Sequence, residues 1–432
     1  MQSLRSPKKT PHKPTESTWY NYNAGYTEGF VEDVLKNLNL PSGATVLDPW
    51  NGTGTTTSVA FRNDFEVHGY DINPATILIA KARLLGSNVV ESLKSLTDDL
   101  VEKVSKGTNV KGNNKTEFDA LDLWFLPDAV TLIRGLEREV YSLFIDKKCY
   151  TPLFHSSSLN HVSSLAALFY VALFRTVRDF VEPEFRSQPM WIKQATSDEK
   201  KLKPSKREVL VKFRTNLIAL SDYIKAKNIQ DGIHDPPKNL NVASAEHLPL
   251  GCNTVDAVIT SPPYCTRIDY AIATLPELAV LGFKDKESLR GLRDKITGTP
   301  TILKETRAIR EEWGNECVRF LKTVESHKTR AAKHYYFKFF HQYFASLHKS
   351  LTEIDRILKP RAKCVIVVQD SYFKNVHNDL PLITSEMAEN IGWELVNKVP
   401  FSVKHNFAFS NRHSKRYREA SMATEAVLIF EK

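Results

Sequence analysis

The feature that most constrains the fold is a glycine-containing turn between a short apolar run and a helical pattern. Residues 44–48 (ATVLD) predict a buried strand that ends in an acidic residue, and the helical pattern after the turn reaches about Arg62. A second strand is predicted over 66–71 and a second helix over 74–85. This order of strand, turn, helix, strand, acid and helix is typical of the opening of a nucleotide-binding α/β sheet.

The turn and the acid behind it suit a ligand that carries a ribose. Glycines allow a tight turn and close approach of the backbone, and the helix that follows offers free N–H groups. Asp71 stands 23 positions after Asp48, where a carboxylate can accept hydrogen bonds from both ribose hydroxyls. The candidate ligand-binding residues are Asp48, Pro49, Asn51, Gly52, Gly54, Thr55 and Asp71.

Two further observations bear on this ligand. The turn lacks the GxGxxG spacing of dinucleotide enzymes and the Lys-Ser/Thr pair of a P-loop, which argues against a pyrophosphate. An ordinary strand-to-helix turn remains an alternative, and so does a helix-capping role for Asp71, because Asp-x-Asn-Pro is suitable cap chemistry.

A second motif, Ser261-Pro262-Pro263-Tyr264, directly follows the apolar strand predicted over 254–260. Two prolines fix the backbone and remove two N–H donors, so the free groups are acceptors: the Ser261 hydroxyl and the Pro262 carbonyl. Acceptors that hold the hydrogens of an aromatic amine favour a pyramidal nitrogen and direct its lone pair toward a methyl donor. Tyr264 offers a flat face for stacking. The alternative is a purely structural Pro-Pro turn.

Together, DPWNGTGTT and TSPPY resemble the amino-methyltransferases of DNA, which make N4-methylcytosine or N6-methyladenine. The resemblance covers residues 19–90, 240–265 and 335–432, the expected catalytic domain. It implies S-adenosylmethionine as the cofactor and an α/β fold with a Rossmann-like, mostly parallel methyltransferase sheet. It also implies a double-stranded DNA substrate whose target base is flipped out of the helix.

The resemblance also assigns roles to residues outside the glycine turn. Residues 20–35 resemble the family segment that closes over the methionine part of the cofactor, which makes Tyr20 a candidate contact. Where the family has an aspartate near the cofactor's adenine, this chain offers Ser244. Asp269 and Tyr270 continue a run found in some members and are weaker candidates for lining the pocket. The implied catalytic residues are Ser261, Pro262, Pro263 and Tyr264.

In this family, serine at the first position of the tetrapeptide tends to accompany methylation of cytosine N4, whereas Asp or Asn tends to accompany methylation of adenine N6. We therefore expect a cytosine-N4 methyltransferase, with adenine N6 as the alternative. An RNA or protein amide methyltransferase, and an inactive DNA-binding module, are less favoured. A C5-cytosine enzyme with Cys265 as nucleophile is also less favoured, because Cys265 follows a tyrosine rather than a proline.

The predicted sheet is interrupted twice along the chain. A helical insertion is expected over 91–239 and a basic helical insertion over 266–334, and the second is a candidate for target recognition. Residues 1–18 predict a basic flexible arm without the apolar segment of a secretion signal. The catalytic part then resumes with the predicted elements helix 335–358, strand 358–370, helix 382–391 and strands 393–399 and 424–431. Two consecutive strands at the end predict a hairpin and an antiparallel last strand.

The net charge of +9 and the pI near 9.1 fit a polyanionic partner. Basic stretches at 201–214 and 405–418 are candidates for DNA contact or for solvated surface. The five cysteines are scattered, which favours a reducing compartment and no metal site. No apolar run approaches the roughly 20 residues of a membrane span. We expect a DNA-associated protein of the prokaryotic cytoplasm, with a companion restriction endonuclease as a further partner.

Overall fold

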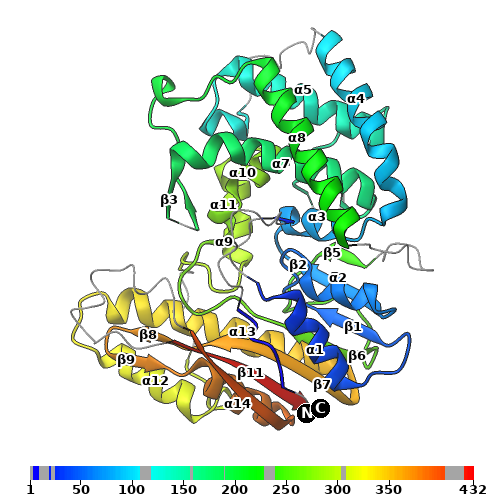
Figure 1. Ribbon diagram of the computed structural model, residues 1–432. Helices are drawn as coiled ribbons and strands as arrows, with labels where there is room; N and C mark the ends of the chain where they lie inside the picture. Colours follow the sequence, from blue (N-terminus) through cyan, green and yellow to red (C-terminus); the bar gives the residue numbers. More distant parts are fainter. Residues whose placement is uncertain are drawn as a thin grey trace.

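The computed structural model describes residues 3–8, 19–20, 25–107, 118–155, 159–188, 190–227, 239–302, 308–403 and 423–432. A seven-stranded sheet lies at its base, in the order β10-β11-β7-β6-β1-β2-β5 (Figure 1). The strands are β1 (Thr45–Asp48), β2 (Glu66–Asp71), β5 (Leu240–Val242), β6 (Val255–Thr260), β7 (Leu358–Gln369), β10 (Glu394–Val403) and β11 (Ala423–Glu431).

Five neighbouring strands of this sheet, from β5 to β7, are parallel. The last strand, β11, runs antiparallel to both of its neighbours, β7 and β10. The α/β class, the mostly parallel sheet and the antiparallel last strand are therefore confirmed.

Helices cover both faces of the sheet because side chains alternate along each strand. Val46 of β1 belongs to the core beneath α1 (Glu28–Leu38) and α2 (Thr55–Arg62). The next residue, Leu47, belongs to the core on the opposite face. The helices of that opposite face are α12 (Asn315–Ser326), α13 (Phe337–Ile357) and α14 (Leu380–Ile391). All four residues of β1 are buried, as expected for a parallel strand covered on both sides.

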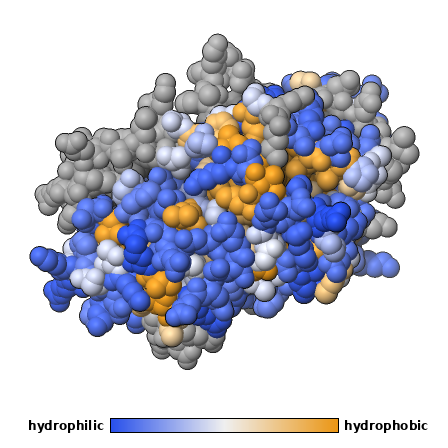
Figure 2. Space-filling model, turned by 90° about the horizontal axis from the view of Figure 1, so that it is seen from below, coloured by the Kyte–Doolittle hydropathy of each residue, from blue (hydrophilic) through white to orange (hydrophobic). Residues whose placement is uncertain are grey.

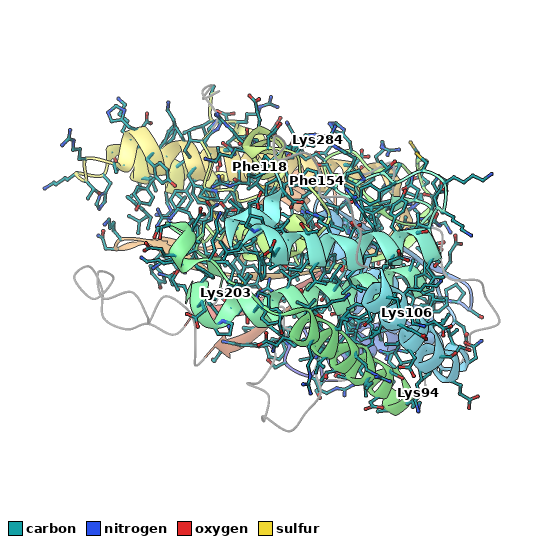
Figure 3. All side chains as sticks on the ribbon, turned by 90° about the horizontal axis from the view of Figure 1, so that it is seen from above. Lys94, Lys106, Phe118, Phe154, Lys203 and Lys284 are labelled. Atoms are coloured by element: carbon teal, nitrogen blue, oxygen red, sulfur yellow. The ribbon has the colours of Figure 1, made fainter. Side chains whose placement is uncertain are left out.

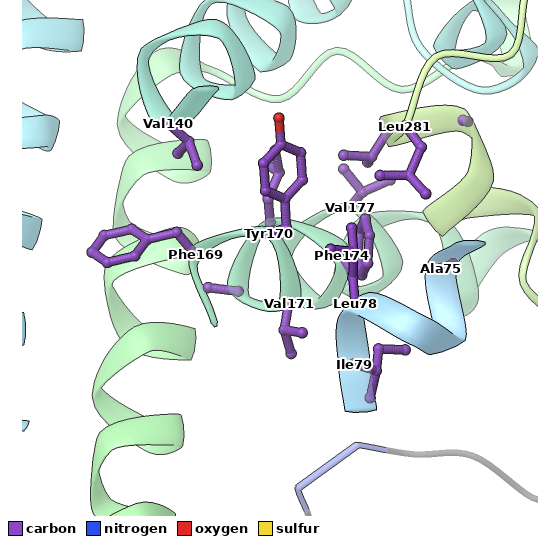
Figure 4. Close-up of a cluster of buried hydrophobic side chains, with 14 of the residues drawn as sticks. Ala75, Leu78, Ile79, Val140, Phe169, Tyr170, Val171, Phe174, Val177 and Leu281 are labelled. Carbon is purple, nitrogen blue, oxygen red and sulfur yellow. The ribbon is translucent and has the colours of Figure 1, made fainter. Parts of the chain in front are cut away.

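A helical block lies beyond the β5 edge of the sheet (Figure 1). Its long helices are α4 (Val90–Lys106), α5 (Pro127–Phe144), α7 (Ser164–Phe185) and α8 (Lys206–Lys227). Helix α7 is central and carries apolar residues around most of its circumference, which is the pattern of a buried helix. Side chains such as Phe174 pack against Leu78 and Ile79 of α3 (Pro74–Ala82), so α3 joins the sheet to the block (Figure 4).

The structure divides residues 266–334 between these two parts. Helices α9 (Tyr270–Ala273), α10 (Leu275–Val280) and α11 (Lys286–Lys295) share the core of the helical block. Phe283 lies 6.1 Å from Phe118 and 5.8 Å from Phe154 between ring centroids, and both partners are marked in Figure 3. Helix α12 and the π-helix Ala332–Tyr336 instead pack with α13 over the sheet.

Two short hairpins complete the described elements: β3 (Arg186–Gln188) with β4 (Trp191–Ile192), and β8 (Ser371–Phe373) with β9 (Val376–Asn378). On the face drawn in Figure 2, hydrophobic side chains lie in separate patches among hydrophilic ones. Within the described ranges, every helix is too short or too polar to cross a membrane.

Candidate active site

The predicted cofactor turn and the predicted catalytic turn meet at one edge of the sheet. Strands β1 and β6 are parallel neighbours that end in Asp48 and Thr260. The Thr260 hydroxyl donates a hydrogen bond of 2.5 Å to Asp48 Oδ1. The carboxyl ends of parallel strands are where α/β proteins bind ligands. This single bond therefore brings both motifs to the same ligand-binding edge.

Asp48 is 2% exposed and fixes the start of the glycine turn. Its Oδ2 accepts a hydrogen bond of 3.0 Å from the Tyr26 hydroxyl, and its Oδ1 accepts one of 3.2 Å from the Trp50 N–H. Burial raises the pKa of Asp48 to about 6, although these donors oppose the shift by favouring the ionised form.

The turn itself needs both glycines. Gly52 and Gly54 have φ values of 48° and 76°, in the left-handed region that most residues avoid. A Cβ on Gly54 would lie 2.7 Å from the Cβ of Ala80, so the turn packs directly against α3. The Gly52 N–H donates to Asp71 Oδ2 at 2.9 Å. Beside them, the Asn51 Nδ2 is buried and has no hydrogen-bond partner among the described residues.

Asp71 lies at the end of β2, where it ties the turn to the following loop. Its Oδ1 accepts a hydrogen bond of 2.8 Å from the Asn73 N–H, and burial raises its pKa. The N-cap of α3 is Asn73, whose side chain accepts from the Ala75 N–H at 3.0 Å. The capping role considered for Asp71 is therefore wrong. The Asp71 carboxylate, the two glycines of the turn and the unpaired Asn51 amide together fit a ligand with a ribose.

Pro49 and Thr55, the two remaining candidate residues of the turn, help to hold its backbone in place. Pro49 is buried directly after Asp48. Thr55 begins α2, and its hydroxyl accepts a hydrogen bond of 3.2 Å from Arg83, which also donates to the Thr53 carbonyl at 3.3 Å. Arg83 thus holds the turn from the end of α3. Contact of either residue with the cofactor stays a prediction.

Ser244 lies at the same edge of the sheet as Asp71. The Ala243 N–H, one residue earlier, donates to the backbone carbonyl of Asp71 at 3.2 Å. The Ser244 hydroxyl accepts a bond of 3.2 Å from the Glu246 N–H, which forms a local turn. This position is compatible with the adenine contact expected of Ser244, which stays a prediction.

Tyr20 is directed toward the helical block. Its hydroxyl hydrogen-bonds to the fully buried Glu277, which Arg178 also binds at 2.6 Å. No described residue links Tyr20 to the glycine turn, so its cofactor contact stays a prediction. The tyrosine that does touch the site is Tyr26, bonded to Asp48 and Thr56. Sequence reasoning missed Tyr26, although its place just before the capped start of α1 was a usable signal.

The predicted catalytic turn is held by strands β7 and β11 and by helix α13. The Ser261 hydroxyl donates to the Val367 carbonyl at 2.9 Å. The Tyr343 hydroxyl donates to the Pro263 carbonyl at 2.7 Å. No described residue donates to the carbonyl of Pro262. The two acceptors expected from the sequence therefore stay available: the Pro262 carbonyl and the lone pairs of Ser261.

Glu425 is a second residue that sequence reasoning missed. It lies on β11, is 6% exposed, and accepts a hydrogen bond of 2.6 Å from the Tyr264 hydroxyl on its Oε1. Its Oε2 is buried without a hydrogen-bond partner among the described residues, and burial raises its pKa. An acidic residue at the start of an otherwise apolar strand was the available signal. Glu425 fixes the orientation of the Tyr264 ring.

The neighbours of the catalytic turn have identifiable roles. Cys265 is 3% exposed, and burial raises the pKa of its thiol, which disfavours the nucleophilic thiolate. Asp269 caps α9 and pairs with Arg293 at 2.6 Å, so its carboxylate is engaged structurally. Burial raises the pKa of Tyr270 to about 12, and the nearby backbone of Tyr264 opposes this shift. Among described residues, no group of three or more acidic, His or Cys side chains could hold a metal ion.

Comparisons with known proteins show that the chain is similar to methyltransferases. It is 22% identical to the type II methyltransferase M.BsoBI of Geobacillus stearothermophilus, over 96% of this chain and 85% of that protein. It is 24% identical to the type II methyltransferase M.MvaI of Kocuria varians, over 83% of this chain and 76% of that protein. No protein-family model matches the chain.

The chain was also matched to one solved structure, a phosphoethanolamine N-methyltransferase of Haemonchus contortus. It is 12% identical over 93% of this chain and 90% of that chain, but the TM-score of 0.17 is too low to support an argument. The alignments with the two type II relatives, by contrast, cover 96% and 83% of this chain. The chain is thus similar to type II methyltransferases over most of its length, which confirms the resemblance to DNA methyltransferases.

Proposed function

We propose that this protein is a site-specific DNA methyltransferase that methylates the exocyclic amine of a flipped base, cytosine N4. The observation that carries the proposal is the Thr260–Asp48 hydrogen bond, which brings the cofactor turn and the Ser-Pro-Pro-Tyr turn to one edge of the sheet. Methyl transfer requires donor and amine to approach within about 3–3.5 Å. The parallel pairing of β1 with β6, together with this bond, supports such an approach because it places the two turns side by side.

On the cofactor side, Asp71 would accept the ribose hydroxyls, and the backbone at Gly52 and Gly54 would allow close approach. The unpaired Asn51 Nδ2 supplies a further donor beside the turn. When bound, S-adenosylmethionine supplies an electrophilic methyl group on a positively charged sulfur. Ser244 and Tyr20 are proposed as outer contacts of the same ligand.

On the substrate side, Ser261 and the Pro262 carbonyl would accept the two hydrogens of the target amine. Ser261 already donates its own hydrogen to Val367, so its oxygen would serve the amine as an acceptor only. Tyr264, held by Glu425, would stack on the flipped base. Direct attack by the amine nitrogen needs no covalent bond between enzyme and base. The raised pKa of Cys265 agrees with that mechanism.

The choice of cytosine N4 over adenine N6 rests on serine at the first position of the tetrapeptide. A DNA partner agrees with the net charge of +9 and with the type II relatives. We place the enzyme in the prokaryotic cytoplasm, and a companion restriction endonuclease is a further proposal.

A methyl-transfer assay tests this function. The protein is incubated with S-adenosylmethionine labelled in the methyl group and with DNA, tRNA or protein as acceptor. We expect the labelled methyl group to appear in DNA and not in tRNA or protein. Ser261→Ala should slow transfer to DNA by roughly 10²–10³, because one preorganised acceptor is lost. Cys265→Ala is the matched control in the same loop and should stay active. Label in tRNA or protein but not in DNA would contradict the proposal.

A further inference from the structure

An exposed arginine follows the catalytic turn and lies against two tyrosines. Arg267 stands three residues after Tyr264, and its guanidinium lies 4.8 Å from the ring centroid of Tyr336 and 5.9 Å from that of Tyr335. Its Nη1 also donates to the Tyr336 hydroxyl at 3.2 Å. We call Arg267, Tyr335 and Tyr336 the arginine platform.

The backbone on both sides of the platform is unusual. Arg267 has a φ of 58°, a left-handed conformation that costs a non-glycine residue of the order of 1 kcal/mol or more. The two tyrosines lie in the π-helix Ala332–Tyr336, a form that is rare and frequent at functional sites. Both rings are held by further contacts. The Tyr335 hydroxyl donates a hydrogen bond of 3.2 Å to the Pro300 carbonyl, and the ring centroid of Tyr336 lies 4.7 Å from that of Phe373.

The segment that carries the two tyrosines of the platform is basic. Residues 327–336 contain Lys328, Arg330 and Lys333 and no acidic residue. All three are exposed, and among the described residues none of them forms an ion pair. Arg319 on α12, by contrast, is paired with Glu316. Exposed cations in the segment that carries the two tyrosines favour an anionic ligand at the arginine platform.

We propose that the arginine platform binds the phosphate backbone of DNA beside the flipped nucleotide. This inference rests on the proposed function and adds which surface of the enzyme holds the strand. A guanidinium is suited to phosphate because it is planar and presents several N–H groups. Its contacts with the two rings restrict its motion, so less side-chain entropy is lost on binding. The position three residues after Tyr264 places the contact next to the target base.

The salt dependence of DNA binding tests the inference. The logarithm of the binding constant falls with the logarithm of salt concentration, with a slope of about −0.9 for each phosphate contact. A fluorescent plasmid fragment is titrated with wild-type protein and with Arg267→Ala between about 50 and 200 mM salt. We expect the slope for Arg267→Ala to be smaller in magnitude by roughly 1, with weaker binding at low salt.

Three further measurements keep the result interpretable. Arg319→Ala removes an exposed but paired arginine and should leave the slope unchanged. Arg267→Asn replaces the alanine variant if that variant is unstable, because asparagine tolerates the left-handed conformation. Binding of S-adenosylmethionine by Arg267→Ala, measured by calorimetry, should equal that of the wild type. If the wild type binds DNA and the Arg267 variants bind it with the same slope, the inference is wrong. If the wild type binds no DNA, the proposed function itself fails.

Discussion

The carboxyl group of Asp48 is buried beneath both turns and accepts hydrogen bonds from Thr260, Tyr26 and Trp50. Two of these donors are far from Asp48 in sequence: Thr260 is 212 positions away and Tyr26 is 22. Sequence reasoning could identify Asp48 as part of a ligand turn from its local motif. It could not identify Tyr26, or the link from Tyr264 to Glu425 across 161 positions, because such contacts depend on the order of strands in the sheet.

The raised pKa of Asp48 predicts a pH-dependent stability difference between wild type and Asp48→Asn. The folded pKa of about 6 exceeds the value of about 3.9 in an unfolded chain. Asp48 therefore contributes stability that is fully present below about pH 4 and is lost as the pH rises through 6. Asparagine does not titrate. From pH 4 to pH 7 the free energy of unfolding of the variant should rise relative to the wild type by about 2 kcal/mol.

Urea unfolding at several pH values measures this difference. Effects of other carboxyl groups are common to both proteins and cancel in the comparison. A difference that stays constant from pH 4 to pH 7 would show that Asp48 has an ordinary pKa.

Among the secondary-structure elements, the sequence predicted most of those that build the sheet. The strands expected over 44–48, 66–71 and 254–260 are present as β1, β2 and β6, because apolar runs bounded by turn residues are a strong local signal. The helix expected over 74–85 ends earlier, at Ala82. The strand expected over 393–399 continues to Val403, because β10 pairs along its length with β11.

Strand β5 and the π-helix could not be predicted. A strand of three residues is too short to show alternation, and β5 exists because it pairs with the exposed edge of β2. At Gly69 a Cβ would lie 2.5 Å from a methyl carbon of Leu240, so this pairing also depends on a missing side chain. The π-helix Ala332–Tyr336 depends on packing against α12 and α13, which no local pattern contains.

The packing of the glycine turn against α3 predicts how substitution of Gly54 changes the stability of the protein. Gly54→Ala should destabilise the protein by roughly 1–3 kcal/mol, because the left-handed conformation and contact with Ala80 both oppose a Cβ. Gly291→Ala is the matched control: Gly291 lies in α11 with no atom within 4 Å of an added Cβ. It should stabilise the protein by about 0.5–1 kcal/mol. Chemical unfolding compares the two. Equal effects of both substitutions would contradict this account of the turn.

Considered as a whole, the molecule consists of a seven-stranded sheet and a helical block that are joined through α3. The composition shows a net charge of +9 but does not show where on the molecule the basic residues lie. The buried Glu277, which binds both Tyr20 and Arg178, connects the segment before the sheet with both helical insertions. The boundaries 1–18, 91–239 and 266–334 stay predictions. The basic segment 405–418 lies outside the described residues.

The central claim is that the Ser-Pro-Pro-Tyr turn delivers a methyl group to an exocyclic amine of DNA. Its most direct test is mass spectrometry of nucleosides from DNA that the pure protein has methylated with S-adenosylmethionine. We predict N4-methylcytosine, present with wild type and Cys265→Ala and nearly absent with Ser261→Ala. Detection of N6-methyladenine would contradict the choice of cytosine as the target base but would agree with methyl transfer to an exocyclic amine. 5-Methylcytosine, or DNA left unmodified, would contradict the central claim.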